Sequence, residues 1–292
     1  MKYKDLKGIS YEEKSIQEAF LRRLYKSVGG RWVLKILISP VISKWLGIFL
    51  DTGISKVLIA PFINWNTLDM KPYVERNYHS YNDFFTREIK PEERMIDCDE
   101  AHLISPSDGK VSAYLLDENS RFQIKHTEYT LESLLRSKKL AHKYRNGYAV
   151  IIRLSVDNYH RYCYPADGVK SDNHAISGVL HTVNPIACET LPVYKENSRE
   201  LTLIKSNYFG DLIQMEVGAL LVGRICNYHQ RGQIKKGQEK GKFEFGGSTI
   251  ILLLEANHVE VDEVFLQNTK EGYETLIQMG ASIGRSLSRK NT

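Results

Sequence analysis

The residue types that catalysis needs occur in a few short stretches of the sequence. Asp108 lies in "SPSDGKV", His160 and Cys163 in "VDNYHRYCYPADG", His181 in "LHTVNP", and Ser248 in "FEFGGSTI". A carboxylate, an imidazole and a hydroxyl are the groups from which proteins build an activated nucleophile and its base. Each stretch alone is also typical of a structural turn or a strand end, so it is their combination that points to chemistry.

The Gly247-Ser248 peptide is suited to self-cleavage. Because glycine has no side chain, the serine hydroxyl can approach the carbonyl of Gly247. Attack turns the amide into an ester, elimination leaves dehydroalanine, and hydrolysis then gives a pyruvoyl group and ammonia. This sequence of steps needs a base beside the hydroxyl and hydrogen-bond donors for the oxyanion. A plain hairpin turn is the alternative explanation, whereas a lipoyl or biotin carrier lacks its usual Met-Lys-Met tripeptide here.

Two regions with different sequence patterns must position these groups. Residues 1–95 show helical periodicity, with an amphipathic segment expected to be capped near Ser10, and residues 96–292 are dominated by short strands. We expect a helix near 130–137, a last helix over 271–288, and strands at 102–106, 110–116, 148–154, 212–217, 219–227, 249–255 and 259–266. The predicted fold class is α+β, with a β-rich barrel- or sandwich-like catalytic core, an N-terminal helical region and a C-terminal helix.

Composition describes an ordinary globular chain with a moderately basic surface. Of the 292 residues, 42% are hydrophobic and 26% are charged, and the net charge is +5. The four cysteines are far apart in the sequence, which argues against a disulfide framework or a cysteine-rich zinc site, so we predict no metal centre. No helix-turn-helix, zinc-finger or RNA-recognition pattern occurs, so we expect no nucleic-acid partner.

The first fifty residues combine basic and apolar side chains in a way that suits a membrane surface. The apolar run from Trp32 to Leu50 contains Lys35 and Lys44, which argue against a segment that crosses the bilayer. We therefore predict that this basic and apolar region lies in the interface of an anionic membrane. Packing against the catalytic region or a partner subunit is the alternative.

In their order along the chain, these stretches resemble the phosphatidylserine decarboxylase family. The resemblance covers nearly the whole length and includes "YNDFFTREIKPEERMID", "SPSDGKV", "VDNYHRYCYPADG", "LHTVNP", "ENSRE", "EVGALLVGRI", "KKGQEKGKFEFGGSTIILL" and "NTKEGYETLIQMGASIG". Members of this family are pyruvoyl enzymes made as self-cleaving proenzymes. The resemblance therefore implies cleavage between Gly247 and Ser248, giving a large chain 1–247 and a small chain 248–292 that begins with a pyruvoyl group derived from Ser248.

The resemblance also implies the reaction, which converts phosphatidylserine to phosphatidylethanolamine and carbon dioxide. The serine amine of the lipid would form a Schiff base with the pyruvoyl ketone, which takes up the electrons left by carbon dioxide. His160 is the candidate proton donor, and Asp108 would orient or polarise the base of self-cleavage. The family further implies a homodimer working on the cytoplasmic face of the cell membrane.

The chain departs from the common family pattern at Cys163. That pattern is His-x-x-His, whose second histidine is assigned as the base of self-cleavage, and here cysteine takes its place. Either His160 serves both steps or His181 supplies the missing imidazole, since Cys163 is a poorer base unless its pKa is depressed. Two other functions stay open, namely a pyruvoyl decarboxylase of another phosphoserine lipid or a soluble amino acid, and an unprocessed lipid-surface binding protein.

Overall fold

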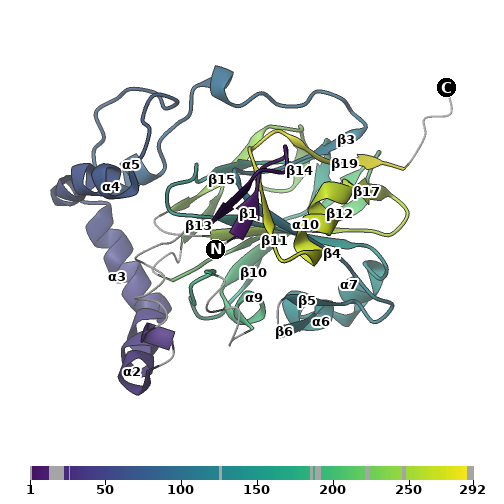
Figure 1. Cartoon of the computed structure of the whole chain (residues 1–292), viewed down its shortest axis with the longest axis horizontal. Helices are drawn as coiled ribbons and strands as arrows, with labels where there is room; N and C mark the ends of the chain where they lie inside the picture. The colour runs from purple at the N-terminus through teal and green to yellow at the C-terminus, as the bar shows by residue number, and fades with distance from the viewer. Residues whose placement is uncertain are drawn as a thin grey trace.

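A large mixed sheet forms the body of the protein, and helices of the N-terminal region lie along one side of it (Figure 1). The computed structural model describes residues 2–12, 23–25, 27–124, 127–184, 187, 192–220, 224–244 and 248–287. Within these residues the sheet is open at both edges, so the predicted α+β class is confirmed but the core is not a closed barrel.

The large sheet contains eleven strands among the described residues, in the order β14-β9-β11-β12-β16-β7-β4-β18-β1-β2, with β10 paired to β11. The neighbours run antiparallel except for the parallel pair β1–β18. The strands are β1 (Lys2–Lys4), β2 (Ser10–Glu12), β4 (Gly109–Leu115), β7 (Tyr148–Leu154), β9 (Gly168–Lys170), β10 (His174–Ile176), β11 (Arg199–Ser206), β12 (Gly210–Val217), β14 (Gly232–Ile234), β16 (Ser248–Leu254) and β18 (Glu274–Ile277).

Smaller sheets and short helices surround this sheet. One small sheet contains β13 (Arg224–Asn227), β15 (Glu239–Glu244) and β8 (Arg161–Cys163); another contains β17 (Val259–Val261), β19 (Ser282–Ser286) and β3 (His102–Ile104); β5 (Arg121–Ile124) pairs with β6 (Thr127–Thr130). The helices are α2 (Val28–Leu37), α3 (Pro40–Leu50), η1 (Gly53–Leu58), α4 (Ile59–Asn66), α5 (Tyr81–Phe85), η2 (Pro91–Glu93), α6 (Leu131–Leu135), α7 (Lys138–Lys143), α9 (Val193–Glu196) and α10 (Glu263–Lys270).

Strand β16 is buried at every position because the large sheet is covered on both faces. On one face Ile251 and Leu253 pack with residues of α2, α6, α7 and α9, which we call the helix-side core. On the other face Ile250, Leu252 and Leu254 pack with residues of β8 and β15, which we call the strand-side core. Side chains of a strand alternate between faces, so each residue of β16 can be assigned to one core or the other.

Most of the expected elements of the catalytic region are confirmed. The strands expected at 102–106, 110–116, 148–154, 212–217 and 249–255 correspond to β3, β4, β7, β12 and β16, and the helix near 130–137 corresponds to α6. The strand expected at 219–227 is present as β13 from Arg224 onward, and residues 221–223 lie outside the described part.

The predicted C-terminal helix over 271–288 is wrong. The helix α10 lies earlier, and strands β18 and β19 follow it, so the strand expected at 259–266 also ends at Val261. Gly272 has a φ of +83°, a left-handed conformation that terminates helices. After it, buried Thr275 and Ile277 alternate with half-exposed Leu276, which is the period of a strand.

The start of the chain also differs from the expectation. Strands β1 and β2 extend the large sheet beyond β18, so Ser10 lies in a strand and does not cap a helix. Residues 13–22 of the predicted amphipathic helix lie outside the described part, while residues 23–25 are helical. Residues 2–12 therefore belong with the catalytic sheet, and the division near residue 95 stays a prediction.

Candidate active site

Ser248 is the first residue of the central strand β16 and is fully buried. It pairs with Leu154 of β7, a member of the strand-side core, so its side chain lies on that face of the sheet. Its Oγ is buried and has no hydrogen-bond partner among the described residues. Gly246 and Gly247, the preceding pair, lie outside the described part of the chain.

His160 lies at the same end of the sheet as Ser248. A tight turn connects it to Leu154, the partner of Ser248: the backbone N–H of Ser155 donates to Asn158 Oδ1 at 2.8 Å. The carbonyl of His160 accepts from the N–H of Phe243 at 2.9 Å, near the end of the strand that leads toward Ser248. The turn after β7 and strand β15, which both lead to Ser248 or its partner, therefore also position the backbone of His160.

The imidazole of His160 is completely buried and held in a defined orientation. Its Nδ1 lies 2.8 Å from the carbonyl oxygen of Asn158, which can only accept, so Nδ1 donates and Nε2 carries the lone pair of the neutral ring. The Phe85 ring packs on it with centroids 4.2 Å apart. This tautomer leaves Nε2 as the atom that can take or give a proton.

Asp108 lies in a buried turn beside β8 and is paired with an arginine. Arg94 donates to both carboxylate oxygens, at 2.8 Å from Nε and 2.5 Å from Nη2, and the N–H of Met279 donates at 2.9 Å. The turn touches β8 through the N–H of Cys163, which donates to the Pro106 carbonyl at 2.8 Å. Among the described residues, the hydrogen bonds of Asp108 are thus to Arg94 and Met279.

Cys163 is buried, and its thiol is a poor base in this position. Burial raises its pKa to about 12, and the negative charges of Glu239 and Asp108 act in the same direction. A thiol with this pKa stays protonated at neutral pH. Activation of a cysteine requires a lowered thiol pKa, whereas this environment raises it.

His181 lies on the other face of the sheet from the Ser248 side chain. Its Nδ1 is 3.4 Å from the hydroxyl of Tyr25, a residue of the helix-side core, and its Nε2 is 3.5 Å from Glu196 Oε2. Burial lowers the pKa of His181, although the Glu196 charge opposes this effect. The Asn197 side chain bonds both the N–H and the carbonyl of His181, which makes a structural role for the "LHTVNP" and "ENSRE" stretches evident.

The structure assigns supporting roles to residues for which the sequence alone indicated none. Arg87 is buried and donates to the Asp157 carbonyl at 3.3 Å, which fixes the turn before His160. Arg161 donates to the Thr86 carbonyl at 2.9 Å and pairs with Glu239 at 3.0 Å, which ties β8 to the segment after α5 and to β15. Together with Phe85 and Arg94, these residues come largely from "YNDFFTREIKPEERMID", so the arginines within that stretch were the available signal.

Comparison with known proteins agrees with this arrangement. Residues 81–285 match the family model described as phosphatidylserine decarboxylase. A phosphatidylserine decarboxylase proenzyme 2 of Clostridium acetobutylicum is 45% identical over 284 residues, which covers 97% of each chain. Phosphatidylserine decarboxylase proenzymes of Clostridium beijerinckii and Clostridium tetani are each 38% identical, covering 95% and 99% of this chain and 96% and 100% of their own.

The chain belongs to the phosphatidylserine decarboxylase family. The family match begins at Tyr81, the first residue of α5, and includes every candidate site residue named above. The three relatives match at least 95% of this chain, so the similarity to phosphatidylserine decarboxylase proenzymes also extends into the helical region before α5.

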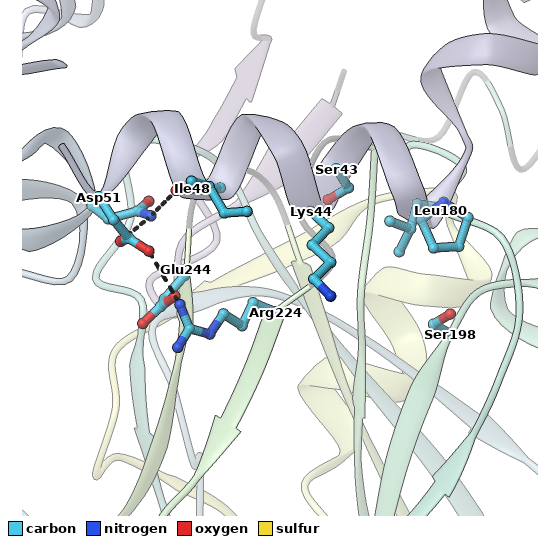
Figure 2. A pocket seen from close by; sticks show the side chains of 11 residues that line it. Ser43, Lys44, Ile48, Asp51, Leu180, Ser198, Arg224 and Glu244 are labelled. Atoms are coloured by element: carbon cyan, nitrogen blue, oxygen red, sulfur yellow. Dashed lines mark hydrogen bonds and ion pairs between the residues drawn. The ribbon is translucent and has the colours of Figure 1, made fainter.

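A cavity of about 550 Å³ lies between α3 and the ends of β13 and β15. Its walls come from one face of α3, from Asn82 of α5, from Ser198 just before β11, and from Arg224 and Glu244 at the ends of β13 and β15 (Figure 2). This cavity therefore adjoins both the helical region, through α3, and β15, the strand that leads toward Ser248.

Proposed function

We propose that this chain is a proenzyme that cuts its own backbone between Gly247 and Ser248 and then decarboxylates phosphatidylserine. The observation that carries the proposal is the placement of Ser248, a buried hydroxyl at the start of the central strand with no hydrogen-bond partner among the described residues. An unsatisfied buried hydroxyl costs about 1–3 kcal/mol, and a reactive role explains its retention. Family membership supports the same chemistry.

For self-cleavage we assign the base to His160. Its Nε2 would accept the proton of Ser248 Oγ as that oxygen attacks the carbonyl carbon of Gly247, which breaks the Gly247–Ser248 amide and forms an ester. Loss of the large chain's carboxylate by elimination leaves dehydroalanine at position 248, and water then releases ammonia. Two features support His160 over the alternatives: it lies at the same end of the sheet as Ser248, and its tautomer leaves Nε2 as the proton acceptor.

Asp108 is assigned as a positioning residue. Burial is the main cause of the raised pKa of both Tyr159 and Cys163, and the negative charge of Asp108 adds to it. Asp108 therefore lies close to the segment that contains His160. Through Arg94 and Met279 it fixes the turn that packs against β8. It would also stabilise the positive charge that His160 gains when it accepts a proton.

Position 248 fits the pyruvoyl group that the family implies. Converting the serine removes its hydroxyl, and a ketone there, conjugated to the next amide carbonyl, would supply the electron sink for decarboxylation. Buried side chains on both faces of β16 would exclude water from this position. His160 would act as the proton donor through Nε2.

We also propose that the helical region rests on the membrane surface that holds the substrate. The chain has three tryptophans, Trp32, Trp45 and Trp65, and all are exposed on α2, α3 and α4, with exposed fractions of 68%, 68% and 73%. Exposed aromatic and aliphatic side chains beside lysines suit an interfacial helix. No single helix among the described residues has the length and apolar composition to span a bilayer; α3 with η1–α4 meets these criteria only as a pair bent by 88°.

Measuring carbon dioxide release from three substrates tests the proposed function. We expect release from phosphatidylserine in detergent micelles, little from glycerophosphoserine and none from free serine, and no release from a Ser248→Ala variant. Equal activity on free serine would favour a soluble amino-acid decarboxylase instead. The homodimer stays a prediction of the family resemblance, which sedimentation velocity would test.

A further inference from the structure

The cavity between α3 and the end of β15 contains a lysine, Lys44, that has no anionic partner among the described residues. Lys44 extends from α3 toward the strands below it, while Arg224 points toward Asp51 and Glu244 (Figure 2). Arg224 lies 3.2 Å from Asp51 and 2.9 Å from Glu244, and Glu244 is also 3.6 Å from Lys242. Within the described part of the chain, Lys44 has no ion pair or hydrogen bond to either carboxylate.

From this arrangement we infer that the cavity is the headgroup pocket and that Lys44 Nζ binds the phosphate of phosphatidylserine. The inference rests on the proposed function and names a residue for substrate binding. The two carboxylates of the cavity are already neutralised by Arg224 and Lys242, so Lys44 supplies the positive charge that remains. A lysine ammonium provides several donors to phosphate oxygens and is a common phosphate ligand.

The position of the cavity fits this role, because two of its walls adjoin the start of β16. Glu244 precedes Ser248 by four residues, which limits their separation to about 14 Å even for an extended chain. On the other side, the carbonyl of Ser198 accepts from the N–H of Gly218 at 2.9 Å, and the preceding residue, Val217, pairs with Thr249. Only a few bonds separate the amine and the phosphorus of the headgroup, so a phosphate bound in the cavity would direct the amine toward the end of the sheet where position 248 lies.

The opposite side of α3 connects the cavity to the proposed membrane surface. Lys44 and Gly47 line the cavity together with Ser43 and Ile48, whereas Trp45 and Phe49 are exposed. One face of α3 therefore lines the pocket with Lys44 in it, and another, apolar face points to the surroundings. The buried Oδ1 of Asn82, in the cavity wall, has no hydrogen-bond donor among the described residues. A lipid lying along α3 would therefore find its headgroup beside Lys44 and its acyl chains beside Trp45.

The phosphate is a better partner for Lys44 than the substrate carboxylate. An ion pair to the carboxylate would stabilise the ground state of the group that must leave and would oppose decarboxylation. The phosphate is present in substrate and product alike, so binding it lowers KM without changing kcat. This difference separates the two assignments experimentally.

The first test compares kinetics of the processed enzyme in nonionic micelles. We expect Lys44→Met to raise KM for dihexanoyl-phosphatidylserine about tenfold, the loss typical of a charge-assisted hydrogen bond, with kcat nearly unchanged. Lys44→Arg should restore most of the affinity because guanidinium also binds phosphate. The matched control is Lys56→Met, which removes an exposed lysine of η1 outside the cavity and should leave KM as in the parent. An unchanged KM in Lys44→Met would overturn the inference.

The second test measures binding to the uncut Ser248→Ala chain by calorimetry, so it does not depend on processing or activity. Glycerophosphoethanolamine, which keeps the phosphate and lacks the carboxylate, should bind about tenfold more weakly after Lys44→Met. Equal binding to the Ser248→Ala chain with and without Lys44→Met would show that Lys44 does not bind the phosphate. Inorganic phosphate should bind much more weakly than glycerophosphoethanolamine; equal affinities would indicate a free-phosphate site and also overturn the inference. A parent chain that binds the probe but never decarboxylates would instead refute the proposed function.

Discussion

At the scale of single residues, self-cleavage depends on which side chain accepts the proton of Ser248. Cys163 occupies the place of a histidine in the common family pattern, but its pKa of about 12 keeps the thiol protonated. His181 has a lowered pKa and is neutral, yet it lies on the helix-side face with Tyr25. His160 is bonded to β15 at the end of the sheet where Ser248 lies, and its tautomer leaves Nε2 as the proton acceptor.

Three single variants test this assignment by the rate of chain cleavage on a denaturing gel. We expect His160→Ala to slow cleavage about 100-fold or more, since a general base contributes about 10²–10⁴-fold. His181→Ala and Cys163→Ala should cleave at the parent rate. A rate that keeps rising toward pH 12 would identify the Cys163 thiolate as the base, because the thiol loses its proton only there.

At the scale of secondary structure, strand β15 holds the backbone that leads to the proposed cleavage site. Lys240 of β15 and Glu216 of β12 form a fully buried ion pair at 2.7 Å, and Lys240 also donates to Asn227 Oδ1 at 2.7 Å. Burial lowers the pKa of Lys240 and raises that of Glu216, while their mutual attraction opposes both shifts. This pair links the small sheet to the central strands just before Ser248.

Removing one member of this pair should destabilise the protein strongly. Lys240→Met leaves Glu216 buried without its counterion, which costs about 3–5 kcal/mol of unfolding free energy. The double variant Lys240→Met, Glu216→Gln should recover most of that loss, since no unpaired charge remains. Urea unfolding of both variants in the uncut Ser248→Ala chain measures the difference; equal stability of single and double variants would refute the role of the pair.

The sequence predicts those elements in which local pattern and tertiary environment agree. The alternation and β-branched content of "YAVIIRL" and "STIILLL" suffice to predict β7 and β16. By contrast, the pattern of "YETLIQMGASIG" predicts a helix, although this segment pairs with β4, β1 and β3. The presence of catalytic residue types was also predictable, but the face of the sheet that each occupies was not. Strand register places Ser248 on the strand-side face, whereas the contact with Tyr25 places His181 on the helix-side face. Burial raises the pKa of Cys163, which the sequence alone does not show.

At the scale of the whole molecule, apolar exposure is concentrated on the helical side of the body. Beyond the three tryptophans, Ile54 and Val57 of η1 are 72% and 71% exposed. Helices α2, α3 and α4 lie along one side of the sheet (Figure 1), which gives the molecule one face suited to a bilayer. The proposed headgroup cavity lies between α3 of this face and the end of β15, the strand that leads to Ser248. In this arrangement the proposed membrane surface, the pocket and the reactive position would follow one another.

Tryptophan fluorescence reports directly on this face because the chain has no other tryptophans. Anionic vesicles should shift the emission to shorter wavelength as the indoles leave water, and higher salt should weaken the effect because surface charges are screened. Titration with vesicles of phosphatidylglycerol and phosphatidylcholine measures the shift, with a Trp45→Phe variant showing a smaller change. An emission maximum that is unaffected by anionic vesicles at low salt would contradict membrane docking by these helices.

The intact mass of the freshly purified protein under denaturing conditions tests self-cleavage most directly. Cleavage at Gly247–Ser248 should give two chains, 1–247 and 248–292, with the small chain lighter by one ammonia than a chain that begins with serine. The Ser248→Ala variant should give one uncut chain in the same measurement. A single uncut parent chain, in the absence and in the presence of anionic vesicles, would contradict self-cleavage at Gly247–Ser248.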